Sequence, residues 1–444
     1  MKPLVDRVLK RVPKGGETTV SLRSDRRGNT RFARGEITSS ADVERFTVSV
    51  TVQFGKRSAT ATTNQTDDGA LDEVVARAAR MAKLAPENPE TMAPLGKQTF
   101  LKAKASDVAT VKLTPAARAK AVGAAIAAGD AAKLAIAGFY EHSATQRALA
   151  TSAGLWVTHD STQASFSCTA RTADGTGSGW AESQSHRAAD VDASALAKIA
   201  VEKASKSATP KKLDPGRYTV ILEPAAVEGL LSFLIGSLGA RRADEGRSFF
   251  AKPGGGTRIG EKLFPEFVTL SSDPIDAQTG GTPFDNEGVP LKPTKWIDKG
   301  KVEALIYGRY WASKQGKPAT GSPTGWTLAS GKATTPPAGV NPAGSIVGSE
   351  LLKGVKRGVL ITRFWYIRDL DPQTILTTGL TRDGTFLIEN GAIAGPVNNF
   401  RFNESPIHML AKCDAVGTPW LTDGMRVPAL RTHEFNLASI SEAV

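Results

Sequence analysis

Residues 217–240 read RYTVILEPAAVEGLLSFLIGSLGA, and the rest of the fold is organised around them. The stretch begins with β-favouring residues, Tyr218 to Leu222, and then changes to a helical pattern. The apolar positions of that pattern recur on one helix face: Val227, Leu230, Leu231, Leu234, Ile235 and Leu238. Pro224 suits a first helical turn, where a missing N–H removes no hydrogen bond. The stretch therefore predicts a strand that leads into a buried helix over 224–238.

The composition is that of a globular protein with more than one core. The chain has 444 residues, 40% of them hydrophobic and 23% charged, which is enough for two or three domains. No apolar run approaches the ~20 residues of a membrane span, and charged residues interrupt the apolar run that a signal peptide needs. Cys168 and Cys413 lie far apart, which is typical of a reducing compartment. We therefore expect a cytoplasmic protein with no membrane segment.

The order of the expected elements indicates an α+β protein of two domains. In residues 1–210, two blocks of β-runs each end in an Asp-capped, Ala-rich helix, at 67–84 and 192–206, which suggests a weak internal duplication. Residues 211–216 have no periodicity and are predicted to be a linker. Residues 217–444 are expected to form a β-rich domain around the helix at 224–238.

Shorter signals predict individual turns and elements. Arg27-Gly28-Asn29 is expected to be a turn between two short strands, and Asn390-Gly391 is the strongest hairpin signal in the chain. A second hairpin is expected to turn at residues 298–300. Residues 350–355 are expected to be helical, and residues 316–346 to be loop.

Several segments, in this order and spacing, resemble the TldD/PmbA family. They are Asp273-Pro274, PFDNEGVP (283–290), GVNPAGSIV (339–347), LLKGVKRGVLIT (351–362) and GTFLIENGAIAGP (384–396). Members of this family were once called modulators of DNA gyrase and are now regarded as metalloprotease subunits. The resemblance implies an α+β fold of two-domain subunits that form a dimer around an enclosed cavity. In a TldD–TldE pair, the TldD subunit holds zinc and cleaves unstructured peptides, while its partner shapes the chamber and binds substrate.

The family motif also indicates which kind of subunit this chain resembles. Catalytic TldD-type members carry an HEAVGH-type segment, and alignment on Ala226-Val227 places Pro224, Ala225 and Gly229 at the positions of its His, Glu and His. None of these three side chains can bind zinc or accept a proton. The resemblance therefore implies a PmbA/TldE-type subunit that binds no cofactor itself and pairs with a zinc-bearing TldD-type subunit, or with a second copy of itself. The family's third ligand, a cysteine near the C-terminus, is not transferred to Cys413.

Four residues are candidates for the substrate cavity. Glu228 replaces the glycine of the catalytic motif, and its side chain is expected to face either the shared cavity or solvent. Phe364, Trp365 and Tyr366 form an aromatic run that could line a peptide-binding surface. Core packing is the alternative for this run, because alternate residues of a strand face inward.

Two other functions compete with the non-catalytic subunit. One is a stand-alone peptidase with a site around His159, His408 and Cys413, although no two of the five histidines have the spacing of a helical zinc pair. The other is a DNA- or gyrase-associated protein. Residues 1–216 hold 31 Lys and Arg against 22 Asp and Glu, a net +9, with a dense piece at 25–36. Phe32 is the one aromatic residue there, and no series of aromatic residues interleaves as stacking platforms, so a solvated hairpin is favoured and nucleic acid is not expected as a partner.

Overall fold

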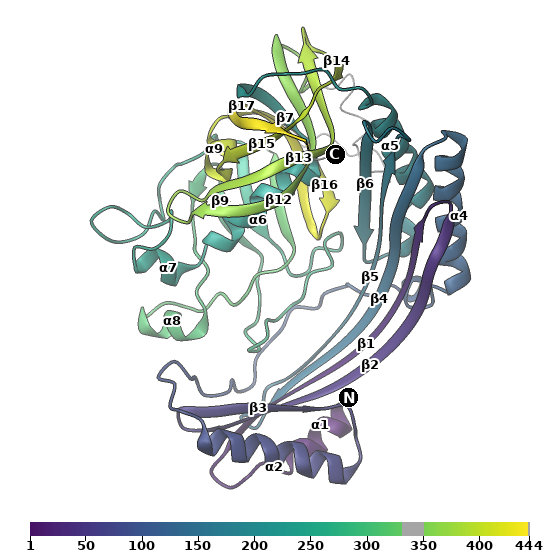
Figure 1. Cartoon of the computed structure of the whole chain (residues 1–444). Coiled ribbons are helices and arrows are strands. Elements are labelled where there is room, and N and C mark those ends of the chain that lie inside the picture. Colours follow the sequence, from purple (N-terminus) through teal and green to yellow (C-terminus); the bar gives the residue numbers. More distant parts are fainter. Residues whose placement is uncertain (331–349, 443–444) are drawn as a thin grey trace.

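A long, curved sheet dominates the computed structural model, which describes residues 1–330 and 350–442. The N-terminal half of the chain forms this sheet, and the C-terminal half lies on its concave side (Figure 1). Helices cover the opposite face of the sheet. This arrangement confirms the expected α+β class, with N-terminal strands, flanking helices and a β-rich C-terminal part.

The N-terminal sheet has six strands in the order β3-β2-β1-β4-β5-β6. Two blocks with the arrangement α-β-β-β-α build it, and the antiparallel pair β1–β4 joins the blocks at its centre. The first block contains α1 (Lys2–Leu9), β1 (Glu17–Ala33), β2 (Glu36–Phe54), β3 (Arg57–Thr63) and α2 (Asp68–Leu84). After the short α3 (Val108–Val111), the second contains α4 (Pro115–Ala131), β4 (Ala135–Thr151), β5 (Trp156–Arg171), β6 (Ser178–Ser185), η1 (Ala188–Asp190) and α5 (Ala193–Lys206).

Side-chain caps fix the starts of the helices in both blocks. The side chains of Asp67, Thr114 and Asp192 each accept a hydrogen bond from the backbone N–H three residues later. The apolar faces of α2 and α5 are buried against the sheet. The helices predicted at 67–84 and 192–206 are therefore confirmed.

The turn predicted at Arg27-Gly28-Asn29 is wrong, because β1 continues through these residues as one strand. Arg118 of α4 is fully buried and crosses the strand at Gly28, where a Cβ would lie 2.2 Å from its Nη1. The guanidinium bonds Asp42 Oδ1 at 2.6 Å and Thr30 Oγ1 at 3.2 Å. The glycine therefore makes room for a buried arginine, and the first hairpin instead turns at residues 34–35, where both residues have positive φ.

Two further expectations about local structure fail. Residues 350–354 form hydrogen-bonded turns and no helix. Within the predicted loop 316–346, the strand β11 (Trp326–Ser330) pairs with β8 (Val268–Ser272), because its apolar residues Trp326 and Leu328 enter the core. The rest of that loop, from residue 331 onward, lies outside the described residues, as does most of the family-like segment 339–347.

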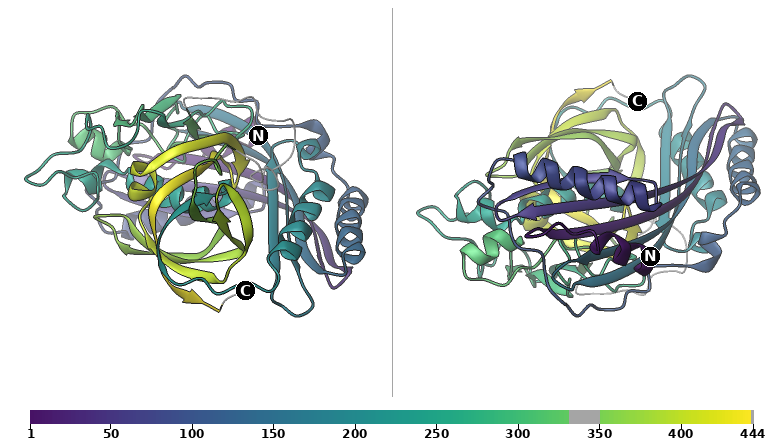
Figure 2. Two further views of the ribbon diagram at one scale, coloured as in Figure 1. Left: turned by 90° about the horizontal axis from the view of Figure 1, so that it is seen from above. Right: turned by 90° about the horizontal axis from the view of Figure 1, so that it is seen from below.

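The C-terminal sheet closes on itself. Its path runs β10-β9-β8-β11-β17-β15-β13-β12-β7, and β7 also pairs with β17, so five strands form a ring. Figure 2 shows this ring from above. The remaining elements are β7 (Gly216–Leu222), α6 (Pro224–Ser237), α7 (Ala240–Asp244), β9 (Thr294–Asp298), β10 (Lys301–Val302), α8 (Arg309–Lys314), β12 (Arg357–Asp371), β13 (Leu376–Glu389), β14 (Ala392–Pro396), β15 (Asn399–Glu404), α9 (Pro406–Ala411), β16 (Cys413–Thr422) and β17 (Met425–Ser441).

Both predicted hairpins of the C-terminal half are present. β13 and β14 are joined at Asn390-Gly391, whose φ values of 48° and 77° are those of a type I′ turn. β9 and β10 are joined at residues 299–300, also with positive φ. Among the described helices, none has the length and apolar character to cross a membrane.

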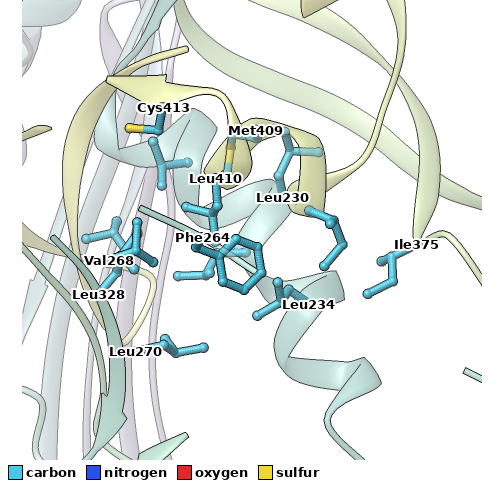
Figure 3. Packing of buried hydrophobic residues seen from close by; sticks show 14 of the residues in the cluster. Leu230, Leu234, Phe264, Val268, Leu270, Leu328, Ile375, Met409, Leu410 and Cys413 are labelled. Atoms are coloured by element: carbon cyan, nitrogen blue, oxygen red, sulfur yellow. The ribbon is translucent and has the colours of Figure 1, made fainter. Parts of the chain in front are cut away.

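The helix predicted from the organising stretch is α6, and it lies in the largest core of the molecule. Leu230 and Leu234 of α6 pack with Phe264, Met409 and Leu410, as Figure 3 shows. Burying a leucine side chain contributes about 1.5–3 kcal/mol relative to leaving it exposed. This core holds α6 rigidly, and its N-terminal turns lie beside the second block of the N-terminal half.

Candidate functional site

The first turn of α6 begins directly at the end of a central strand. β7 pairs in parallel with β12, and Glu223 continues this pairing when its N–H donates to Ile361 O at 3.0 Å. The Glu223 carbonyl then accepts from the N–H groups of Ala226 and Val227. Pro224 occupies the first helical position, where its lack of an N–H group removes no helical hydrogen bond. The strand, cap and helix therefore place residues 224–229 in a fixed position.

A buried ion pair links this turn to the second N-terminal block. Lys203 Nζ of α5 lies 2.6 Å from Glu223 Oε2, and the two side chains are only 8% and 2% exposed. Lys203 also donates to Trp180 O at 3.3 Å. Burial raises the pKa of Glu223 above its ordinary range, and Lys203 opposes that rise. Glu223 Oε1 is buried without a hydrogen-bond partner among the described residues.

Three carboxyl groups from three elements lie near enough beside α6 to influence one another's charge, and we call Glu228, Glu182 and Asp423 the acidic cluster. Glu228 lies on the second turn of α6, Glu182 on β6, and Asp423 in the turn between β16 and β17. Burial, followed by the charges of Asp423 and Glu182, raises the pKa of Glu228 to about 8. Burial also raises the pKa of Glu182, although Thr422 Oγ1 donates to its carboxylate at 2.7 Å. Glu228 is therefore mostly protonated at neutral pH and can donate a hydrogen bond.

From the sequence, the side chain of Glu228 is expected to face either the shared cavity or solvent. In the structure this side chain is half-buried and lies near the carboxyl groups of Glu182 and Asp423.

An arginine borders the acidic cluster on its β12 side. Arg363 Nη1 lies 3.1 Å from Asp383 Oδ2, and its guanidinium carbon lies 4.1 Å from the centre of the Trp180 ring and 5.1 Å from that of Trp365. The charge of Arg363 acts to lower the pKa of Glu182 against the effect of burial. The site thus has a cationic, aromatic border on one side of its carboxyl groups.

The aromatic run on β12 divides between core and surface. Phe364 is buried and lies 4.4 Å from Phe402 and 5.7 Å from Phe435, measured between ring centres. Trp365 and Tyr366 are 42% and 65% exposed, because a bulge between Trp365 and Arg368 interrupts the strand alternation. Within this run, Trp365 and Tyr366 therefore expose their rings at the surface, and Phe364 belongs to the core.

The residues at the start of α6 do not fit a zinc site. Pro224 and Ala225 have no donor atom, and a Cβ at Gly229 would lie 3.1 Å from Ile367 Cδ1, so a larger side chain there must displace Ile367. Within residues 1–330 and 350–442, no three His, Cys, Asp or Glu side chains gather in a way that could hold a metal ion.

The structure does not bring His159, His408 and Cys413 together. His159 lies on β5, facing the concave side of the N-terminal sheet. His408 is exposed on α9, with Nδ1 3.3 Å from Glu404 Oε1. Cys413 is buried in the core around α6, where burial raises its pKa to about 12. No hydrogen bond joins any two of them in the described part of the chain.

Sequence reasoning missed three residues of this site: Lys203, Glu182 and Asp423. The position of Lys203 could have been recognised from the sequence, because it falls three residues after Ala200 and seven after Leu196, on the apolar face of α5. A lysine in such a stripe indicates a buried partner. No local pattern in the sequence identifies Glu182 or Asp423, because they approach Glu228 only through the tertiary fold.

Comparison with known proteins identifies the family. Three family models match successive parts of the chain: PmbA/TldA metallopeptidase domain 1 over residues 19–82, the central domain over 108–208 and the C-terminal domain over 215–439. No curated protein matches.

Solved structures share the fold over almost the whole chain. A proposed modulator of a DNA gyrase from Thermotoga maritima is 19% identical with a TM-score of 0.85, covering 98% of this chain and 99% of that one. A proposed modulator of DNA gyrase from Bacteroides thetaiotaomicron is 20% identical, with a TM-score of 0.83 and 99% of both chains covered. TldE from Thermococcus kodakarensis is 18% identical with a TM-score of 0.84, covering 99% of this chain and 100% of that one. Because the C-terminal model alone spans more than half of the sequence, the chain belongs to the PmbA/TldD metallopeptidase family.

Proposed function

We propose that this chain is a non-catalytic, TldE/PmbA-type subunit that pairs with a zinc-bearing TldD-type subunit to degrade or process unstructured peptides in the cytoplasm. One observation carries the proposal. In a chain that matches the family along its length, the first turns of α6 hold Pro224, Ala225 and Gly229, which offer no metal-binding side chain.

The surroundings of α6 support a role in shaping and binding. Glu228, with its pKa raised to about 8, presents a mostly neutral carboxyl group at neutral pH. Trp365 and Tyr366 expose aromatic surface on the neighbouring strand β12. Neutral hydrogen-bonding groups and exposed aromatic rings suit the backbone and side chains of an extended peptide.

Co-expression with a TldD-type subunit of the same organism tests the proposal. We expect a complex of the two chains by size-exclusion chromatography with light scattering, and greater cleavage of an unfolded peptide than the TldD-type subunit gives alone. Zinc analysis of the purified chain should find almost none, against about one zinc per complex. Failure to form a complex together with no gain in cleavage would overturn the proposal. So would about one tightly held zinc on this chain alone, which would favour the stand-alone peptidase.

A further inference from the structure

A basic cavity of about 290 Å³ lies between the concave face of the N-terminal sheet and the C-terminal half. Strands β1, β4, β5 and β6 supply one wall. Residues 278–282, together with Leu421 and Gly424, supply the other. This volume is at the small end of ligand pockets, so it suits a single side chain or chain terminus.

The strand register builds the wall in rows across three neighbouring strands. Arg23 of β1 is opposite Arg147 of β4, which is opposite His159 of β5. Four residues further along β1, Arg27 is opposite Ser143 of β4, which in turn is opposite Gln163 of β5. Alternation along each strand turns these side chains to the same face, away from the helices. The array is therefore a direct product of the pairing.

The cavity carries positive charge without a carboxylate in its lining. Arg23, Arg27 and Arg147 line it together with two histidines, and its lining contains no Asp or Glu. Arg23 is paired with Asp25 just outside the lining, and Arg147 donates to Asn286 Oδ1 at 2.8 Å. Arg27 has no ion pair or side-chain hydrogen bond with any described residue. Asp25, which lies between Arg23 and Arg27 on β1, acts on all three arginines, and Asp285 acts on Arg147. Two carboxylates offset part of the charge of three guanidinium groups, and an anion in the cavity would offset the remainder.

Buried polar atoms around the cavity also lack partners. His159 Nε2, His186 Nδ1 and Thr279 Oγ1 are buried with no hydrogen bond among the described residues, and all three residues line the cavity. His159 is only 6% exposed. Native proteins satisfy the great majority of such groups with protein, water or ligand. These atoms give the cavity hydrogen-bonding capacity in addition to its charge.

The cavity adjoins the acidic cluster next to α6. Gly424 and Gln184 line the cavity. Asp423, which precedes Gly424 and whose N–H bonds Glu182, is a neighbour of Glu228. A group held in the cavity would therefore lie beside the first turns of α6, where the proposed function places the peptide.

We propose that this cavity is an oxyanion subsite, in which Arg27, Arg147 and the polar groups around His159 bind a carboxylate carried by the peptide. Guanidinium groups bind carboxylates through paired, charge-assisted hydrogen bonds. The carboxylate comes from an acidic side chain or from the C-terminus of the peptide. That a peptide supplies it rests on the proposed function, whereas the binding of an oxyanion rests on the cavity alone.

Peptide binding to the full-length chain tests the subsite. The probes are fluorescent unstructured peptides that differ only in one Glu-to-Gln change or in amidation of the C-terminus, measured by anisotropy at low salt. We expect the Glu-to-Gln change or the amidation to weaken binding about ten-fold, the scale of one charge-assisted hydrogen bond. Whichever change has this effect identifies the source of the carboxylate. Equal binding of all the peptides would overturn the proposal.

Matched variants locate the binding. Arg27→Gln should weaken binding of the peptide that carries the recognised carboxylate about ten-fold and leave binding of its neutral counterpart, the Gln or the amidated peptide, unchanged. Arg26→Gln removes the same charge from the next residue, which points to the other face of β1, and should change neither. Arg147→Gln provides a second test within the cavity, with thermal melting to verify folding. Equal effects of Arg26→Gln and Arg27→Gln would overturn the proposal.

These results separate the two proposals. A complex that cleaves peptides, from a chain that binds the carboxylate-bearing and neutral peptides equally, would sustain the proposed function and reject the subsite. Selective binding of acidic peptides by a chain that forms no complex would reject the proposed function and sustain the subsite.

Discussion

Lys203 and Glu223 form a buried ion pair, 2.6 Å from Nζ to Oε2, that connects the last helix of the N-terminal half to the residue preceding α6. The pair crosses between the two halves of the chain close to the candidate site. Its position makes the orientation of α6 depend on α5.

Removing Lys203 should therefore be costly. Lys203→Met leaves the Glu223 carboxylate buried without its cation, and we expect a loss of about 3–5 kcal/mol in the free energy of unfolding. Urea denaturation would measure it. Lys206→Met, which removes an exposed lysine of the same helix paired with Glu202, should cost less than about 0.5 kcal/mol. If Lys203→Met together with Glu223→Gln is no more stable than Lys203→Met alone, the uncompensated charge is not the cause.

The acidic cluster should make stability depend on pH. Because the pKa of Glu228 is about 8 in the folded chain and ordinary in the unfolded chain, its contribution is fully present below about pH 4.5 and is lost as the pH rises toward 8. Glu228→Gln stays neutral, so it should exceed the wild type in stability by ~1–3 kcal/mol at pH 8 and by little at pH 5. Urea denaturation at several pH values measures the difference. Glu202→Gln, at an exposed position, is the control, and a constant difference for Glu228→Gln would contradict the expectation.

Gly28 should not tolerate a side chain, even though its backbone conformation is extended. A Cβ there would lie 2.2 Å from Arg118 Nη1 and 2.4 Å from Asp42 Oδ1, and Arg118 has no free space to enter. We expect Gly28→Ala to destabilise the chain by about 2 kcal/mol or more. Gly123→Ala, in the interior of α4 with open space at its Cβ, should stabilise by roughly 0.5–1 kcal/mol. Thermal melting of both variants provides the comparison, and similar effects would refute the crowding at Gly28.

Phe364 and Trp365 should respond differently to truncation. Phe364→Ala opens the core around Phe402 and should cost about 3–5 kcal/mol. Trp365→Ala removes an exposed ring and should cost less than about 1 kcal/mol, while weakening peptide binding if the ring contacts substrate. Denaturation and peptide titration of the two variants test this assignment. Full peptide affinity in Trp365→Ala would remove Trp365 from the binding surface.

Both cysteines should be inert in the folded chain. Burial raises the pKa of Cys168 and of Cys413 to about 12, so almost no thiolate exists at pH 8. We expect a thiol reagent to label neither until denaturant is added. Rapid labelling of Cys413 in native conditions would support the alternative that the chain is a stand-alone peptidase, as would loss of peptidase activity in Cys413→Ala.

The strong local signals in the sequence predicted the elements around the site well. The spacing of apolar residues from Val227 to Leu238 gave α6, and Asn390-Gly391 gave its hairpin, because both depend on residues close together in the chain. The strand β1 was predicted as two short strands, since polar residues occur on both of its faces around Gly28. One face of this strand meets a polar cavity instead of a core, so the alternation that identifies a half-buried strand is lost.

The charged parts of the site depend on contacts that no local pattern encodes. Glu228 is close in space to Glu182 and Asp423 only because β6 and the β16–β17 turn meet at α6. The basic residues from 25 to 36 were expected to form a solvated hairpin, but Arg27, together with Arg23, lines a cavity against the C-terminal half. Sequence reasoning placed Pro224, Ala225 and Gly229 at the start of α6 but did not find the charged groups that surround them.

The central pairing of β1 with β4 has a consequence for how the chain folds during synthesis. Thr19 is opposite Thr151, so one edge of a 17-residue strand stays without its neighbour until the second block has been made. An open edge of that length is a template for another chain, and pairing across so many residues is slow. The nascent first block therefore carries an exposed edge that is prone to aggregation, and β4 of the second block covers that edge once it has been made.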